Sequence, residues 1–452
     1  MYVLLSIVVP CALLICVIWR LRSARLAWLA GFVVATCAGA AYLPSDTFSL
    51  ALPGLGIPLR WADVCFFALT VAWIAIRAEH RRPAPLILTV GGMSLVLWVA
   101  WVGLQVPLAW VDDGAVKLGV PLAMRYWLYV PLGAFMLVDI FRRRTRSEAA
   151  AFMDVVGAVA VFLGVLYVCS ALGLPVYPSS KLLLQQTEVG SITRGYITFC
   201  YWTVVAVPWY AAKSRMTIWS VLALAVLATT AVLSYSRGLV ISLTLAGLVA
   251  AVLPAMAHGS GAKMARRFAA AVVVVALLGT LAVLVAPQNV KYVGIRFGSA
   301  FVERGATPSM QQSRVGAFAS VSRSLGMQGR LTGLGFSRKG AATIEALSGR
   351  LILGDSLWTV TNAQLGFLGV TVLACCVGAF VLTGISAVRA SWHSDMRIEA
   401  AMLAAIVGVA MRTFSGSEWV IGAPVASGLV LALLMASRQK AWAIDADSAE
   451  SA

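Results

Sequence analysis

Five arginines stand singly where long apolar segments begin or end. They are Arg60, Arg125, Arg194, Arg237 and Arg412. A guanidinium presents a planar fork of N–H donors that matches phosphate oxygens in a bidentate contact. Snorkelling, in which the stem lies in lipid and the charge reaches the headgroups, would explain any one of them. Five at one level of a membrane favour a second interpretation, a ring that binds a lipid-linked phosphate or diphosphate.

A sixth arginine, Arg314, lies in a basic segment that is too long for a plain connection. Residues 287–362 contain nine Lys or Arg and only three acidic residues, a balance that predicts an anionic partner. The basic residues are Lys291, Arg296, Arg304, Arg314, Arg323, Arg330, Arg338, Lys339 and Arg350. Apolar residues recur at helical spacing around Phe318. We therefore predict a short amphipathic helix over about 311–325, lying at the membrane surface.

A general base for this face has to come from a carboxylate. The three histidines, His80, His258 and His393, fall in loops on the opposite side of the membrane. No His, Cys or carboxylate cluster has metal-ligand spacing, so we expect no metal and no other cofactor. Asp355 is our first choice as base, and Glu303 or Glu345 the second.

The elements that would position these residues are apolar helices. Of the 452 residues, 61% are hydrophobic and 12% are charged, against about 25% charged in a soluble domain. A soluble fold has too little interior to bury so much apolar surface. A cytosolic enzyme, a disordered chain and a secreted disulfide scaffold are thereby excluded. The net charge of +17 would suggest nucleic acid in a soluble protein. Here it reflects membrane topology, and we expect no nucleic-acid partner.

We predict an all-α polytopic membrane protein with about 12–13 transmembrane helices, since a span needs about 20 mostly apolar residues. The predicted spans are 2–19, 26–43, 58–76, 85–104, 123–141, 150–172, 196–212, 217–234, 238–257, 268–286, 364–386, 400–414 and 420–437. Residues 1–286 would hold helices 1–10, 287–362 one large periplasmic loop, 363–437 helices 11–13 and 438–452 a cytoplasmic tail.

Orientation follows from the loop charges. One set of alternate loops and the C-terminal tail hold 19 of the 35 basic residues, and the positive-inside rule assigns that side to the cytoplasm. These residues are Arg20, Arg22, Arg25, Arg77, Arg81, Arg82, Arg142, Arg143, Arg144, Arg146, Lys213, Arg215, Lys263, Arg266, Arg267, Arg389, Arg397, Arg438 and Lys440. The single arginines and the loop 287–362 then face outward.

Several short motifs follow one another in a familiar order. One is Ser234-Tyr-Ser-Arg-Gly238, between two short apolar helices. The others run along the long loop into the next helix: Ser313-Arg314, Gly333-Leu-Gly-Phe336, Gly354-Asp355-Ser356 and Leu365-Gly-Phe-Leu-Gly369. Together with the many spans and one large outer loop, they resemble the O-antigen polymerase and ligase superfamily of bacterial inner-membrane glycan enzymes.

The resemblance implies a multi-pass protein of the bacterial inner membrane that uses undecaprenyl-diphosphate-linked glycans as donor and acceptor. It implies metal-independent glycosyl transfer on the periplasmic face, with Arg237 and Arg314 binding the diphosphate. A flippase and a chain-length regulator of the same pathway would be partners, besides membrane lipid. Ligases of this superfamily usually carry His-Asn where this chain has Asp355-Ser356. That difference favours a polymerase of the Wzy type and makes Asp355 the substitute base.

Three alternatives remain open at the level of sequence. Asp355 is equally suited to cap the helix that follows it. An O-antigen ligase or protein O-oligosaccharyltransferase would use the same donor. A lipid-linked glycan flippase is a third possibility, although a transporter should place charged or polar groups at mid-depth, where Asp154 is the main ionisable residue.

Overall fold

The computed structural model describes residues 50–51, 58–59, 61–78, 89–113, 119–141, 145–171, 174, 182–187, 190–195, 200–213, 217–234, 237–257, 261–262, 291, 314–336, 356–392, 395–413 and 430–432. The predicted spans 2–19, 26–43 and 268–286, most of 420–437 and the predicted tail 438–452 lie outside these residues.

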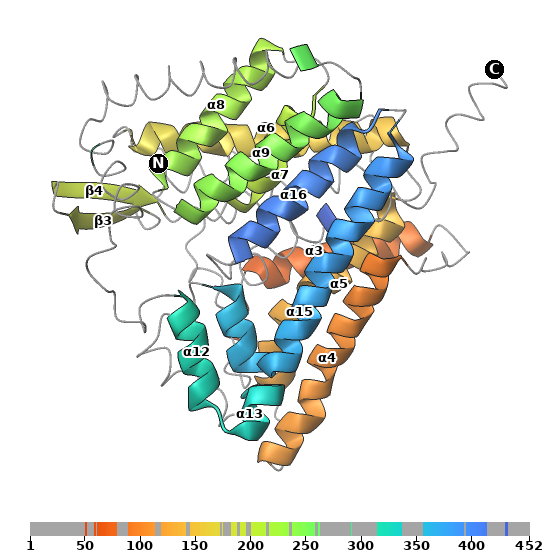
Figure 1. Ribbon diagram of the computed structural model, residues 1–452, viewed down its shortest axis with the longest axis vertical. Coiled ribbons are helices and arrows are strands. Elements are labelled where there is room, and N and C mark those ends of the chain that lie inside the picture. The colour runs from red at the N-terminus through yellow and green to blue at the C-terminus, as the bar shows by residue number, and fades with distance from the viewer. Residues whose placement is uncertain are drawn as a thin grey trace.

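The described part of the chain is mainly helical (Figure 1). Its helices are α3 (Trp61–Ala78), α4 (Val90–Asp113), α5 (Gly119–Phe141), α6 (Arg146–Ala171), α7 (Cys200–Ala211), α8 (Ile218–Leu233), α9 (Arg237–Ala257), α12 (Arg314–Ser324), α13 (Met327–Thr332), α15 (Leu357–Ala390) and α16 (Arg397–Thr413). Four strands form two antiparallel hairpins, β1 (Leu50–Ala51) with β2 (Pro58–Leu59) and β3 (Leu182–Thr187) with β4 (Gly190–Gly195).

Four of these helices contain a stretch long and apolar enough to cross a membrane. The stretches are Val90–Val111, Arg146–Ser170, Gly238–Ala257 and Leu357–Ala390. This agrees with the prediction of a helical, multi-pass membrane protein. Five further predicted spans coincide with α3, α5, α7, α8 and α16, and the short helix predicted over 311–325 is present as α12.

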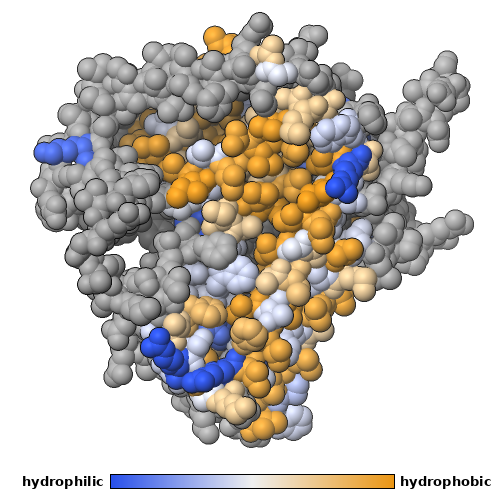
Figure 2. Space-filling model, in the orientation of Figure 1, coloured by the Kyte–Doolittle hydropathy of each residue, from blue (hydrophilic) through white to orange (hydrophobic). Residues whose placement is uncertain are grey.

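The outside of the bundle is apolar where lipid would contact it. Figure 2 shows a largely apolar surface over the part of the molecule that α4 and α15 occupy in Figure 1. Large hydrophobic side chains on these two helices are exposed, among them Leu97, Leu104, Phe367 and Leu382. Exposed apolar side chains are unfavourable in water but are accommodated in a bilayer, because the lipid tails around them are equally apolar.

Small residues bring the helices of the core together. Gly408 of α16 sits against Ser242 and Ala246 of α9, and a Cβ at Gly408 would approach Ala246 Cβ to 3.0 Å. Gly157 of α6 likewise faces the ring of Tyr210. Close approach through small residues is the usual packing device of membrane helices, where no hydrophobic effect drives association.

Ion pairs join the helix ends that carry the predicted cytoplasmic charges. Arg146 at the start of α6 pairs with Glu399 at the start of α16, at 2.5 Å. Arg77 lies 3.8 Å from Asp139, near the last turns of α3 and α5. We call this side of the bundle the basic end. Basic residues that the sequence assigns to one side of the membrane therefore lie at one end of the bundle.

Candidate functional site

Helix α15 is broken at Gly366, whose φ of 67° and ψ of −172° are not helical. This conformation is essentially restricted to glycine, because any Cβ would be strained there. The break divides α15 into a short first part, Leu357–Leu365, and a long second part, Phe367–Ala390, which is by itself long enough to cross a bilayer. The sequence predicted a helix only from 364. We call the side opposite the basic end, where α15 turns, the break end.

The motif Gly333–Phe336 docks onto this break. The backbone N–H of Leu334 donates to the Ala363 carbonyl at 2.8 Å, and that of Gly335 donates to the Gln364 carbonyl at 2.9 Å. The last carbonyls of a helix lack partners within it, so these bonds satisfy the end of the first part of α15. A Cβ on Gly333 would overlap the Gln364 carbonyl oxygen, and one on Gly366 would overlap that of Leu331. Both glycines are needed for the contact.

Helix α12 packs beside the first part of α15. Val321 of α12 and Leu325 just after it form a buried cluster with Ala363, and Asn362 Nδ2 donates to Ser322 Oγ at 2.8 Å. Figure 1 shows the two helices side by side and running in the same direction. The first turn of α12, which begins at Arg314, therefore lies at the level where α15 begins.

The start of α15 is bonded to the end of α16. Trp358 Nε1 donates to Thr413 Oγ1 at 3.0 Å, and the Ser356 hydroxyl donates to the Thr413 carbonyl oxygen at 3.4 Å. Ser356 occupies the N-cap position of α15, but its side chain makes no cap hydrogen bond. Arg412, half-buried, precedes Thr413 in the last turn of α16.

The first turn of α9 lies at the same level. Farther along α9, Ser242 and Ala246 contact Gly408 of α16, while Leu253 and Ala257 near the end of α9 pack near the start of α16. The two helices therefore run antiparallel, which brings the beginning of α9 beside the last turn of α16. The backbone positions of Arg237, Arg314 and Arg412 thus gather around the start of α15.

The side chains of several predicted site residues lie outside the described part of the chain. Arg237 and Arg314 are the first residues of α9 and α12, and Arg194 lies in β4 opposite Leu183, but the structure describes only their backbone. Arg60 and Asp355 lie outside the described residues. Their assignment to a diphosphate ring and a general base remains a prediction.

Arg125 is engaged by a buried carboxylate. Its Nε lies 2.7 Å from Asp63 Oδ1 and its Nη2 donates to Asp63 Oδ2 at 3.1 Å. Tyr129 donates a hydrogen bond to the same carboxylate. The side chains of Arg125 and Asp63 are only 11% and 6% exposed. The guanidinium predicted for phosphate therefore holds α5 against α3 in this structure.

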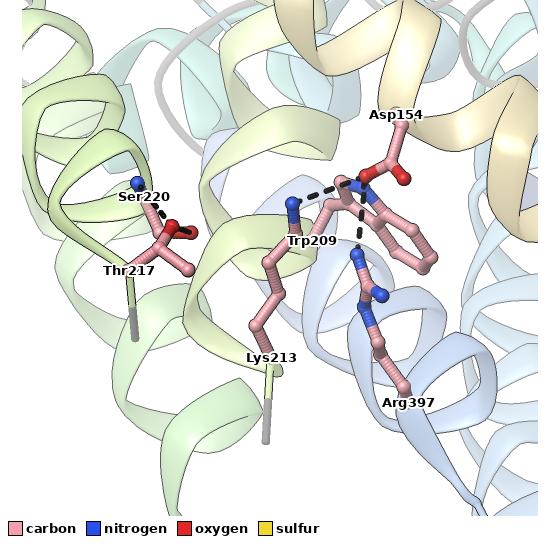
Figure 3. A network of polar contacts seen from close by, with 6 residues as sticks. All are labelled: Asp154, Trp209, Lys213, Thr217, Ser220 and Arg397. Atoms are coloured by element: carbon pink, nitrogen blue, oxygen red, sulfur yellow. Dashed lines mark hydrogen bonds and ion pairs between the residues drawn. The ribbon is translucent and has the colours of Figure 1, made fainter. Parts of the chain in front are cut away.

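Asp154 is the ionisable residue that the sequence placed nearest mid-depth. It lies at the centre of a polar network that joins α6, α7 and α16 (Figure 3). Its Oδ1 accepts from Trp209 Nε1 at 2.9 Å and lies 3.1 Å from Lys213 Nζ and 3.2 Å from Arg397 Nη2. The Arg397 guanidinium also stacks on the Trp209 ring at 3.8 Å. The charge of Asp154 is balanced by Lys213 and Arg397, so we interpret the network as a joint between α6, α7 and α16.

An apolar cavity opens between α4, α5, α15 and α16. It is lined by Trp98, Trp127, Leu357, Phe380 and Ala410, and by Thr413. Leu357 and Thr413 also belong to the junction of α15 and α16, so the cavity adjoins the place where the arginine-bearing helix ends gather. Its lining offers almost no polar group and suits a hydrocarbon chain.

No known family model matches the chain, and no curated protein matches it significantly.

Proposed function

We propose that this protein polymerises undecaprenyl-diphosphate-linked oligosaccharide repeat units on the periplasmic face of the bacterial inner membrane. The observation that carries the proposal is the convergence of the helix ends bearing Arg237, Arg314 and Arg412 on the start of α15. The N-termini of α9 and α12 add backbone N–H donors to the guanidinium groups of Arg237 and Arg314, and both favour an anion, whereas Arg412 stands at the C-terminal end of α16 and contributes its side-chain charge alone. A diphosphate has enough oxygen atoms to accept bidentate contacts from several guanidinium groups at once.

In the proposed reaction, a hydroxyl oxygen of one lipid-linked repeat unit attacks the anomeric carbon of the growing chain. The new glycosidic bond forms as the bond between that carbon and the diphosphate oxygen breaks. Asp355 accepts the hydroxyl proton, and undecaprenyl diphosphate leaves. Arg237, Arg314 and Arg194 stabilise the negative charge that develops on the leaving group, with Arg60 and Arg412 at the rim. No metal is required for this step.

The apolar cavity supports a lipid-linked substrate. A polyprenyl chain needs a hydrocarbon path from the headgroup site into the bilayer, and the cavity between Trp98, Leu357 and Ala410 begins beside that site. Arg125 enters the proposal only indirectly, because its pairing with Asp63 fixes the helix that contributes Trp127 to the cavity.

A flippase, the third possibility after a polymerase and a ligase, deserves comparison because transporters use broken helices to bind substrate. Their breaks lie near the bilayer midplane. In α15 the break leaves the whole of Phe367–Ala390 to cross the membrane, so Gly366 belongs to one end of the span. That position favours chemistry at a surface over transport through the middle.

Purified protein in lipid nanodiscs, supplied with lipid-linked repeat units, would test the proposal. We expect Arg237→Ala and Arg314→Ala each to abolish polymer, and Arg314→Lys to be severely impaired because an ammonium cannot reproduce a bidentate contact. Arg323→Ala is the matched control, an exposed arginine on the same helix as Arg314. Normal polymer in both alanine variants would refute the proposal. Deletion of the gene separates a polymerase, which leaves single repeats on their acceptor, from a ligase, which leaves polymer on its carrier.

A further inference from the structure

Helices α4 and α15 pack antiparallel, and three contacts set their register. Gly91 N donates to Thr383 Oγ1 at 3.2 Å, and Cys376 Sγ lies 3.2 Å from the Ser94 carbonyl. Further along, Trp101 Nε1 lies 3.0 Å from where a Cβ on Gly369 would be. One more helical turn brings Gln105 of α4 level with Leu365 and the break.

One face of the first part of α15 packs against the segment of α4 that contains Gln105. Leu357 and Leu365 are buried together with Val102 and Ala109 of α4. Thr361 lies midway between the two leucines, four residues from each, and therefore on the same face. Gln105 lies between Val102 and Ala109. The register and this shared cluster thus bring Gln105 and Thr361 into one apolar surrounding.

The polar groups in this surrounding have no hydrogen-bond partner within the part of the chain that the structure describes. Gln105 is 1% exposed, and neither its amide nitrogen nor its amide oxygen forms a hydrogen bond. Thr361 Oγ1, Trp101 Nε1 and Gln364 Oε1 are likewise buried without a partner. The neighbouring indole shows the contrast, because Trp98 Nε1 donates to the Trp127 carbonyl at 2.9 Å. Buried polar groups are normally paired, so such a cluster requires partners from outside the chain, either ordered water or a ligand that replaces it.

We propose that Gln105, Thr361, Trp101 and Gln364 form a subsite for the hydroxyl groups of a sugar. The site mixes donors with acceptors: the indole donates, the Gln364 oxygen accepts, and the Gln105 amide does both. A hydroxyl also donates and accepts, whereas an anion would need donors alone. The buried acceptor oxygens of Gln105 and Gln364 would repel the oxygens of a diphosphate, so the mixture favours a hydroxyl over an anion. The identity of the ligand as a glycan rests on the proposed function.

The test measures binding without turnover. The probe is the oligosaccharide released by mild acid from the lipid-linked fraction of the host cells, titrated by NMR against the full chain in nanodiscs. We expect Gln105→Leu to weaken binding by about tenfold or more, the effect of losing hydrogen bonds to a buried amide. Thr361→Val and Trp101→Phe should each weaken it several-fold. Ser170→Ala removes another buried, unpartnered hydroxyl, on α6, and should leave binding unchanged.

Thermal unfolding of the empty protein separates binding from structure. Removal of an unpaired buried amide should leave the melting temperature of Gln105→Leu unchanged or raise it. Unchanged affinity in Gln105→Leu and Trp101→Phe overturns the proposal, as does failure of the wild-type protein to bind the probe. A loss of binding with a matching fall in melting temperature also overturns it, because the amide would then be structural. Polymer formation without probe binding refutes the subsite alone, whereas probe binding without polymer refutes only the polymerase.

Discussion

Gly366→Ala should undock the motif Gly333–Phe336 from helix α15. At φ 67° and ψ −172° a side chain is strained, which costs about 1–3 kcal/mol. The new Cβ would also meet the Leu331 carbonyl and the Gly333 nitrogen, so the two segments must separate. Separation breaks two backbone hydrogen bonds, from Leu334 and Gly335, each contributing about 0.5–1.5 kcal/mol. Together these terms predict a loss of about 2–6 kcal/mol at the break.

The loss is local, so two measurements are needed. Trypsin should cut at the exposed Arg330 faster in Gly366→Ala than in wild type, and polymer formation should fall because the start of α15 loses its support. Gly378→Ala is the matched control on the same helix, where a Cβ would meet no atom within 4 Å. It should be neutral or stabilising by about 0.5–1 kcal/mol, since alanine favours a helix interior. Equal cleavage rates and equal activity in the two variants would refute this account of the break.

Three further predictions concern topology, catalysis and packing. Alkaline phosphatase fused near Arg330 should be active and a fusion near Arg144 inactive; the reverse pattern would invert the assigned orientation. Asp355→Asn should lower the rate of polymerisation in vitro by orders of magnitude at unchanged thermal stability, and a rate within a few-fold of wild type would remove this carboxylate from the mechanism. Asp63→Asn strips the carboxylate from a buried arginine, and should destabilise the protein by about 3–5 kcal/mol in thermal or denaturant unfolding. A wild-type melting temperature in that variant would show that the pair contributes little.

Much of the helical layout could be predicted from the sequence, because a membrane span has a strong compositional signal. The predicted spans 150–172 and 238–257 correspond to α6 and α9, and the helix predicted around Phe318 is α12. Loop charges correctly grouped Arg146 and Arg397, which lie at one end of the bundle. Within the described residues, composition therefore predicted the long apolar helices, and loop charge predicted that the starts of α6 and α16 lie together.

The tertiary structure decided how the motif residues meet. The glycines at 333 and 366 stand far apart along the chain, and no periodicity indicates that their backbones are in contact. Gln105 carries even less signal, since a single amide in an apolar span looks like a tolerated polar residue until its partners are sought. Arg125 was predicted from its place at a helix end, and only the packed structure shows that its guanidinium pairs with the buried carboxylate of Asp63. Local composition determines where a helix forms, but a site depends on which side chains and backbone groups lack partners, and that is a property of the packed molecule.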